Sequence, residues 1–492
     1  ELAKGTIENL YEDQFNIYRA FTTAEDELYL SYVSTDKEQK AKRQSILISR
    51  IKKMFKNLKE ESDVVSKNDS ILTAESTFNQ MLSNIKDFKQ GKEIDEIWFA
   101  VYNWYMQNDE WKPKLKEAIK GFSHKNDAEK ITEENIKRLY GNTLKTSVSR
   151  LEQYRECPFS FHLKYGLKLK EREEFVVRPI DTGSFMHEVI DEFFENTKNI
   201  KTIEDQEIKE IVNNIIDEKL SLSKNYIFTS TPRFAVLTNI LKKAILQSIT
   251  YIVQQMKNSD FEIAGNEIEF NRKIDNVEIT GKIDRIDTAQ NEQGKYIRII
   301  DYKSSDRSIN LNELEAGTQI QLLTYLDTAV EKTKNIPVGM LYFNLIDPVI
   351  KASRNLTDEQ IQEELKKQFR MSGMVLADVN IIRMMDKNLQ TGASSTIPVT
   401  LDKNGDIMDS RSNAITKEQF TLLQNKVKKI IKQIAKEILE GNIEIKPTYN
   451  KGKKEEACKY CEYKSICCFN PNVNNYSFID NKSKKELLDN LQ

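Results

Sequence analysis

The distribution of the five cysteines constrains the fold of this chain more than any other feature. Cys458, Cys461, Cys467 and Cys468 fall within eleven residues, whereas Cys157 stands more than 300 residues earlier. The spacing of the first three brings their thiolates within reach of one centre, and a four-coordinate centre needs a fourth ligand. Because adjacent cysteines rarely bind one metal together, Cys157 is favoured over Cys468. The fold must then bring residue 157 against the C-terminal segment.

Composition excludes several classes of protein. Five cysteines in 492 residues are too few for a disulfide scaffold, and on chemistry alone a four-thiolate centre fits structural zinc or an iron–sulfur cluster equally well. A formal net charge of −2 excludes a globally cationic surface but not a local basic channel. No apolar run reaches the roughly 18 residues of a membrane span, and no leader pattern opens the chain. We therefore expect a cytoplasmic protein without a membrane partner.

Hydrophobic periodicity indicates a mixed α/β chain. Residues 40–140 are charged and helix-periodic, and Trp98, Trp104 and Trp111 are expected in a core there. A short strand is expected at residues 28–33. From Ser147 onward the patterns predict helices at 183–196, 205–222, 235–257, 312–331, 357–369 and 417–440, strands near 261–273, 276–288, 295–303 and 337–345, and a long insertion of loops and short elements over 371–415.

Two of these strands carry acidic residues and a lysine where a buried strand opens into a loop. Alternation places Asp284 on the polar face of its strand, and Asp301 and Lys303 share one face of the next. The intervening Asn291–Gly294 segment predicts a hairpin turn, which would let the two carboxylates converge beside the lysine. Such a set provides oxygen ligands for Mg²⁺ or Mn²⁺ and a cation near a phosphate, as metal-assisted phosphodiester hydrolysis requires.

These residues carry a resemblance to a known family. Segments that resemble the motifs of RecB-type PD-(D/E)XK nucleases occur in the expected order at Ser147–Tyr154, Cys157–Phe159, Gly183–His187, Gly281–Asp287, Ile300–Ser305 and Gln321–Tyr325. Together with the cysteines, they make the chain similar to the C-terminal part of the AddB family, the B subunits of bacterial AddAB helicase-nucleases. The resemblance is specific from about residue 145 to residue 470.

The resemblance implies a role for individual residues. The implied catalytic residues are Asp284, Asp301, Lys303, Gln321 and Tyr325. The implied ligands of a catalytic Mg²⁺ or Mn²⁺ are His187, Asp284, Asp301 and the main-chain carbonyl of Tyr302. The implied ligands of a [4Fe-4S] cluster are Cys157, Cys458, Cys461 and Cys467, with Cys468 outside the set. The resemblance thus favours iron–sulfur over zinc.

The resemblance also divides the chain. Tyr18–Leu30 resembles the last motif of superfamily 1 helicases, but Thr23 stands where that motif has an arginine, and no G-x-x-x-x-G-K-[ST] loop occurs anywhere. Residues 1–145 are therefore expected to be the end of an inactivated helicase-like domain and a helical linker, without ATPase activity. Residues 146–445 would form a nuclease domain with a central mixed sheet flanked by helices, and residues 446–492 a cysteine-containing tail packed on it.

Basic residues interleave with aromatic ones directly after Cys157, and we expect four of them to contact DNA, namely Lys164, Lys168, Lys170 and Arg172. A second basic set, Lys426, Lys428, Lys429 and Lys432, could also neutralise DNA phosphates, although a charged stretch is usually a solvated face. The favoured function is a metal-dependent DNA exonuclease that degrades the 5′-ended strand during double-strand break repair. It would act on single-stranded tails at duplex ends beside an AddA-like helicase-nuclease A subunit. The alternative is an inert DNA-binding scaffold protein with a structural zinc or iron–sulfur site, which the intact Asp284, Asp301 and Lys303 disfavour.

Overall fold

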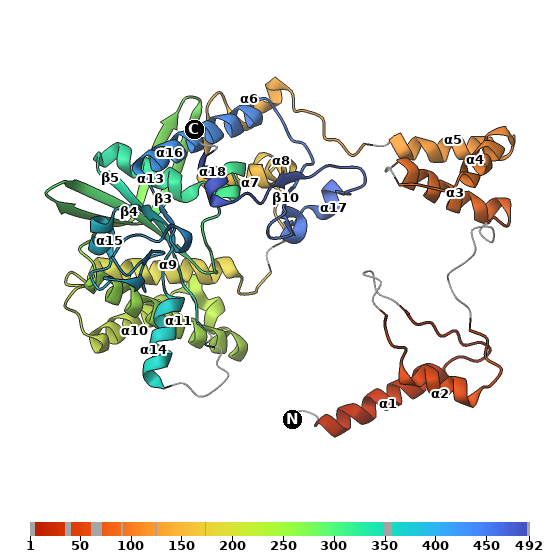
Figure 1. Ribbon diagram of the computed structural model, residues 1–492, viewed down its shortest axis with the longest axis horizontal. Coiled ribbons are helices and arrows are strands. Elements are labelled where there is room, and N and C mark those ends of the chain that lie inside the picture. The colour runs from red at the N-terminus through yellow and green to blue at the C-terminus, as the bar shows by residue number, and fades with distance from the viewer. Residues whose placement is uncertain are drawn as a thin grey trace. The chain divides into compact units, whose positions relative to one another are not determined.

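The computed structural model describes residues 5–34, 41–60, 71–89, 92–123, 125–172, 174–348, 350 and 357–489. The chain forms two compact units, Glu1–Ser123 and His124–Gln492 (Figure 1). The sequence predicted a boundary at residue 145, but the two units divide between Ser123 and His124. The boundary lies earlier because α6 (Glu133–Tyr140) and β1 (Leu144–Thr146) pack within the second unit. The helicase-like origin of the first part stays a prediction. Within the described ranges, no helix combines the length and the apolar character that crossing a membrane requires.

The first unit is helical. Its helices are α1 (Thr6–Thr22), α2 (Ile46–Met54), α3 (Ala74–Lys89), α4 (Ile97–Gln107) and α5 (Trp111–Lys120). A small core joins the last three of them through Met81, Trp98, Tyr105 and Leu115.

Two expectations for the first unit need correction. Trp98 is buried as expected and Trp111 packs against the core, but the side chain of Trp104 is 50% exposed. Residues 28–33 lie outside the strands of the structure. Their apolar side chains are not covered by a core, since Tyr29 is 87% and Val33 65% exposed. A short apolar segment becomes a strand only when a partner strand and a core cover it.

The second unit contains the remaining elements. Its longer helices are α7 (Val148–Glu156), α9 (Pro179–Asn196), α10 (Asp205–Ser221), α11 (Pro232–Lys257), α12 (Leu311–Ala316), α13 (Gln321–Thr333), α14 (Asp358–Gln368), α15 (Val379–Met385), α16 (Lys417–Leu439) and α18 (Lys484–Asp489). Single turns form α8 (Pro158–Phe161) and α17 (Lys464–Cys467). Its strands are β1, β2 (Glu262–Ile274), β3 (Val277–Asn291), β4 (Gly294–Lys303), β5 (Ile336–Asn344), β6 (Ser372–Leu376), β7 (Gly392–Ala393), β8 (Thr400–Leu401), β9 (Ala414–Ile415), β10 (Thr448–Asn450), β11 (Glu455–Glu456) and β12 (Ser477–Ile479).

The centre of the second unit is a seven-stranded mixed sheet in the order β1-β3-β4-β5-β6-β9, with β2 also paired to β3. The pairs β1–β3, β4–β5 and β6–β9 are parallel, and β2–β3, β3–β4 and β5–β6 are antiparallel. Figure 1 shows α13 and α16 on one side of the sheet and α9, α10 and α11 on the other. The expected mixed α/β fold, with a central sheet flanked by helices, is confirmed.

Two segments differ from the predicted elements. The helix expected over residues 312–331 is two helices, because Gly317 adopts a left-handed φ of +85° and ends α12. The expected insertion at 371–415 does consist of short elements, but β6 and β9 within it extend the central sheet. Strands of two to five residues take their structure from the sheet they join, so local pattern did not distinguish them from loop.

Two arginines share one aspartate inside this sheet. Asp287 is fully buried and accepts hydrogen bonds from Arg285 Nε at 2.6 Å and from Arg298 Nε at 2.9 Å. Burial opposes ionisation, but the charges of both arginines hold the pKa of Asp287 below its ordinary value. Arg298 Nη1 has no hydrogen-bond partner among the described residues. We refer to Arg285, Asp287 and Arg298 as the buried triad.

Candidate functional site

Three carboxylates lie in one row across neighbouring strands. Continuing the antiparallel registers of β2–β3 and β3–β4 places Glu267 and Asp301 on either side of Asp284. Directly opposed residues of paired strands point to the same face of a sheet. β3 also changes its second neighbour here, pairing with β1 at Val277–Ile279 and with β4 from Arg285 onward. The row therefore lies where the sheet opens.

Backbone and imidazole contacts hold this row. The Tyr302 N–H donates to Asp284 Oδ2 at 2.8 Å, and the Tyr302 carbonyl oxygen lies 3.1 Å from His187 Nε2. His187 Nδ1 lies 3.7 Å from Glu267 Oε1 and 3.6 Å from Asp284 Oδ2. His187 comes from α9, whose opposite face is buried in the core through Met186, Val189, Ile190 and Phe193. Burial of that face of α9 thus orients the His187 imidazole toward the ends of the strands.

The donor atoms suit a divalent cation. One ligand atom each from His187, Glu267 and Asp284 lie within 4.8 Å of one another. Carboxylate oxygens with one imidazole nitrogen form a ligand set that accepts Mg²⁺ or Mn²⁺. The structure thus brings His187, Asp284 and the Tyr302 carbonyl together, as the resemblance implied, and adds Glu267. Glu267 also forms an ion pair with Lys282.

Burial and mutual repulsion disfavour the ionised form of Asp284 and Asp301. Burial, and then the charge of Asp301, raise the pKa of Asp284 to about 7. Burial also raises the pKa of Asp301, against the opposing charge of Lys303. Burial alone would lower the pKa of His187, but the Glu267 hydrogen bond and the charge of Asp284 raise it. A site with these shifts gains free energy from added positive charge.

A hydrogen-bonded chain positions the lysine. Lys303 Nζ lies 2.5 Å from Asp301 Oδ2 and donates to Gln321 Oε1 at 3.0 Å. Gln321 Nε2 in turn donates to the Tyr325 hydroxyl at 3.0 Å. Gln321 and Tyr325 share one face of α13, so the structure brings both beside Lys303. Gln319 lies off this face, where its amide binds Asn310 N and the Ser308 carbonyl.

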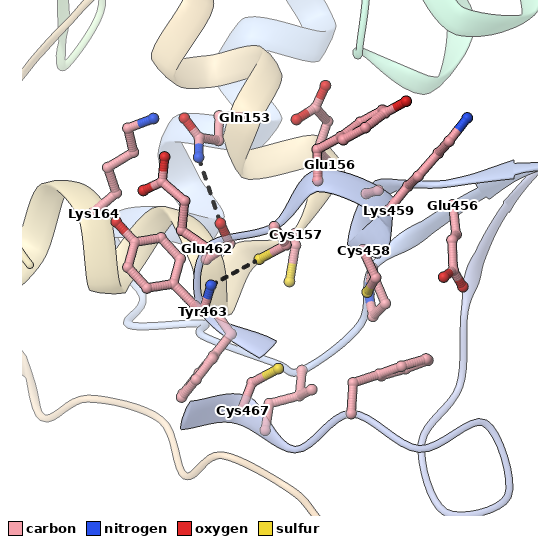
Figure 2. Close-up of a pocket in the computed structure, with 18 of the residues that line it drawn as sticks. Gln153, Glu156, Cys157, Lys164, Glu456, Cys458, Lys459, Glu462, Tyr463 and Cys467 are labelled. Carbon is pink, nitrogen blue, oxygen red and sulfur yellow. Dashed lines mark hydrogen bonds between the residues drawn. The ribbon is translucent and has the colours of Figure 1, made fainter. Parts of the chain in front are cut away.

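The predicted cysteine ligands line one cavity of about 420 Å³ in the second unit, namely Cys157, Cys458, Cys461 and Cys467. Figure 2 shows the thiols of Cys157, Cys458 and Cys467 around the same space. Cys157 follows α7, while the other three come from the segment around α17. Cys468 is exposed and does not line the cavity. The chain therefore joins segments more than 300 residues apart, as the cysteine spacing required.

Burial disfavours the ionised form of these thiols. Burial raises the pKa of Cys157 and of Cys467. Burial and the neighbouring Cys157 raise the pKa of Cys458 to about 12. Thiolates are the form that binds metals, so ionising this set at neutral pH requires a cation or cluster to stabilise it.

The basic residues differ in their surroundings. Lys164, Lys168, Lys170 and Arg172 are exposed, and Lys164 lines the cysteine cavity. Their contact with DNA stays a prediction. Within the second basic set, three members form ion pairs with carboxylates on the same unit, Lys426 with Glu315 at 3.7 Å, Lys428 with Asp327 at 3.2 Å and Lys432 with Asp275 at 2.8 Å. Carboxylates thus neutralise much of that set.

Two family profiles match parts of this chain. A family profile described as the PD-(D/E)XK nuclease superfamily matches residues 145–468, which hold the carboxylate row, the lysine and the four thiols. The chain belongs to this superfamily. Residues 66–121 match a second profile, described as the fifth domain of the ATP-dependent helicase/deoxyribonuclease AddB.

Comparison with individual proteins over the length of this chain agrees with these matches. The PD-(D/E)XK chain is 38% identical over 518 aligned residues to a protein of Clostridium acetobutylicum named as the B subunit of an ATP-dependent helicase/deoxyribonuclease. Proteins of the same name from Clostridium novyi and Thermoanaerobacter sp. are 37% and 36% identical. These alignments cover 99–100% of this chain but only 44–46% of each relative, so the chain spans less than half their length. The expected resemblance to AddB is confirmed.

Glu267 is the site residue that sequence reasoning missed. The signal was present, because β2 and β3 are joined by the two-residue turn Asp275–Asn276, with Ile274 paired to Val277. Counting outward from that turn places Glu267 opposite Asp284. Glu267 itself adopts a left-handed φ of +49°, an irregularity that strand alternation does not predict.

Proposed function

We propose that this chain is a metal-dependent deoxyribonuclease that acts as an exonuclease on the 5′-ended strand in double-strand break processing. The observation that carries the proposal is the convergence of Asp284, Asp301 and Lys303 beside His187 at an opening of the central sheet. Membership of the PD-(D/E)XK superfamily supports nuclease chemistry. The strand polarity and the role in recombinational repair rest on the resemblance to AddB.

The residues divide the work of phosphodiester hydrolysis. His187, Asp284, Asp301 and the Tyr302 carbonyl would hold Mg²⁺ or Mn²⁺, with Glu267 as a further donor. When bound, the cation would lower the pKa of the attacking water and neutralise charge on the phosphate and on the departing 3′ oxygen. The Lys303 ammonium lies beside Asp301, where it can orient the water and offset phosphate charge. Gln321 holds that ammonium in place through its amide oxygen.

The cysteine cavity supports a [4Fe-4S] cluster over a single zinc ion. Tetrahedral zinc with bonds of about 2.3 Å holds its sulfur atoms roughly 4 Å apart. Among the described residues, His187, Glu267 and Asp284 form the only group of three potential ligands whose donor atoms all lie within 4.8 Å of one another. No three of the cavity thiols are therefore that close together, so they are more widely spaced than in such a zinc site. A four-iron cluster is larger than one ion and keeps its thiolates further apart.

The partners follow from the relatives' names. Those proteins are named as the B subunit of a helicase/deoxyribonuclease, which supports an A subunit as partner and DNA as substrate for this chain. A single-stranded tail at a duplex end is the proposed substrate form, with Lys164, Lys168, Lys170 and Arg172 contacting its backbone. We expect no ATP turnover from the chain itself, which lacks a phosphate-binding loop.

Cleavage of end-labelled single-stranded DNA tests the proposal. The purified chain should release nucleotides from 5′-ended strands with Mg²⁺ and not with a chelator present. Asp301→Ala should abolish cleavage while its circular dichroism and unfolding transition stay unchanged, because the change removes a ligand and little core volume. Undiminished Mg²⁺-dependent cleavage by that variant would overturn the site. No cleavage by the unaltered chain would favour the inert DNA-binding scaffold instead.

A further inference from the structure

Helix α7 lies between the two centres. Its C-terminal residue precedes Cys157, which lines the cysteine cavity, and the helix packs against α13 and α16. α13 carries Gln321 and Tyr325 at the nuclease site. The two centres are therefore joined by the contact between α7 and α13.

One side chain makes that contact specific. Glu152, in the middle of α7, accepts hydrogen bonds through Oε1 from Ile320 N at 2.6 Å and from Gln321 N at 2.9 Å. These are N–H groups at the start of α13, which have no partner within their own helix. The N-cap residue Ile320 supplies no side-chain cap. A carboxylate from a helix far away in sequence thus caps α13.

The capped residue is the one that holds the lysine. Gln321 receives the Glu152 bond on its backbone N–H and the Lys303 bond on its side-chain oxygen. Moving the first turn of α13 would therefore move the acceptor for the Lys303 ammonium. The contact chain runs from α7 through Glu152 and Gln321 to Lys303 and Asp301.

The local environment is unfavourable for a carboxylate with no other role. Burial raises the pKa of Glu152 to about 7, although both backbone hydrogen bonds and the charges of Arg307 and Lys303 oppose that rise. An amide or hydroxyl could cap the helix without this desolvation cost. The nearby positive charges of Arg307 and Lys303 favour an acid at this position.

We propose that Glu152 is a positioning residue that fixes Gln321, and through it Lys303, against the helix leading to the cysteine centre. The proposal rests on the nuclease function proposed above. Loss of the Glu152 carboxylate should lower kcat for DNA cleavage between about 10-fold and 100-fold, because small displacements of a catalytic group have large effects on rate. KM should stay within about twofold, since Glu152 is not placed to touch DNA.

The test compares the full chain with Glu152→Ala, Glu152→Gln and a control, Glu437→Gln. Glu437 pairs with Arg155 of α7 at 3.0 Å but sits on α16, so its change disturbs the same helix without touching Gln321. We expect Glu152→Ala to lose kcat with unchanged KM and iron content, and with only the small fall in unfolding midpoint that loss of a helix cap causes. Glu152→Gln, which keeps an oxygen acceptor, should retain activity within about threefold, and Glu437→Gln should cleave like the unaltered chain.

Amide hydrogen exchange gives a readout that does not depend on cleavage. Protection of the peptide that includes Ile320 and Gln321 should fall in Glu152→Ala and persist in Glu437→Gln. Unchanged protection, full kcat in Glu152→Ala, or equal loss of kcat in the control would each overturn the proposal. So would loss of iron and stability in step with kcat, which would indicate a merely structural cap. If the unaltered chain does not cleave DNA, the proposed nuclease function is wrong. Amide hydrogen exchange at Ile320 and Gln321 would still decide whether Glu152 fixes the start of α13.

Discussion

Asp287→Ala should strongly destabilise the second unit, because it leaves two charged guanidinium groups buried without a counter-ion. The side chains of Arg285 and Arg298 are only 3% and 2% exposed, and Asp287 is 0% exposed. Arginine does not lose its proton in proteins, so neither group can become neutral. Breaking a buried ion pair costs about 3–5 kcal/mol, and here one carboxylate serves two partners. We expect a loss of about 5 kcal/mol in the free energy of unfolding, a large part of the total stability of a typical domain.

The positions of the tryptophans provide an internal reference for this measurement. All three, Trp98, Trp104 and Trp111, belong to the first unit. Tryptophan fluorescence during urea unfolding therefore reports the first unit, whereas far-ultraviolet circular dichroism reports mainly the larger second unit. Asp287→Ala should move the circular dichroism transition to lower urea and leave the fluorescence transition in place.

An exposed ion pair of the same unit serves as the matched control. Lys137 and Glu133 form an i,i+4 pair at 2.6 Å with side chains 57% and 79% exposed, so Glu133→Ala should leave the circular dichroism transition close to that of the unaltered chain. A loss in Asp287→Ala no larger than in Glu133→Ala would refute the reasoning. An equal shift of the fluorescence transition would also refute it, because the effect would then not be confined to the second unit.

Three further predictions concern the two centres. Lys303→Ala should slow DNA cleavage roughly 100-fold or more while calorimetric Mn²⁺ affinity persists, since an ammonium group is not a ligand; lost affinity would contradict this division of roles. The Mn²⁺ affinity of the metal-free chain should rise as pH increases from about 6 to about 8, because the raised pKa of Asp284, about 7, keeps its carboxyl protonated below that pH. Titration calorimetry at several pH values checks this, and a flat profile would count against Asp284 as a ligand. Cys458→Ser should release iron and increase protease sensitivity, whereas Cys468→Ser should do neither; equal losses of iron in both variants would show that the ligand set is wrong.

The parts of the fold that follow local rules were predictable from sequence. The β3–β4 hairpin was predicted because apolar residues alternate on both sides of a turn, and the Asn291 side chain does stabilise that turn by accepting from Gln293 N and Gly294 N. The break between α12 and α13 was missed, although Gly317 marked it. The strands β6 and β9 were missed because they depend on neighbours distant in sequence.

The candidate site shows the same division. Asp284, Asp301 and Lys303 could be placed together because one hairpin turn sets their register. His187 and Gln321 lie on helices whose approach to the sheet is fixed by tertiary packing, so the family resemblance and not periodicity indicated them. Glu152 lies within the Ser147–Tyr154 motif, but its role could not be predicted, because capping of a helix 168 residues away leaves no trace in local sequence.

The distance in sequence between Cys157 and its partners has a consequence during protein synthesis. At 5–20 residues per second, the ribosome adds the roughly 300 residues from Cys157 to Cys458 in about 15–60 s. By then β9 has been made, and with it every described strand of the central sheet. The central sheet can therefore form in the nascent chain before the other three cavity cysteines have been synthesised, while Cys157 is still the only cavity thiol present. A chain that stops before Cys458 would keep those strands and lose three of the four cavity thiols at once.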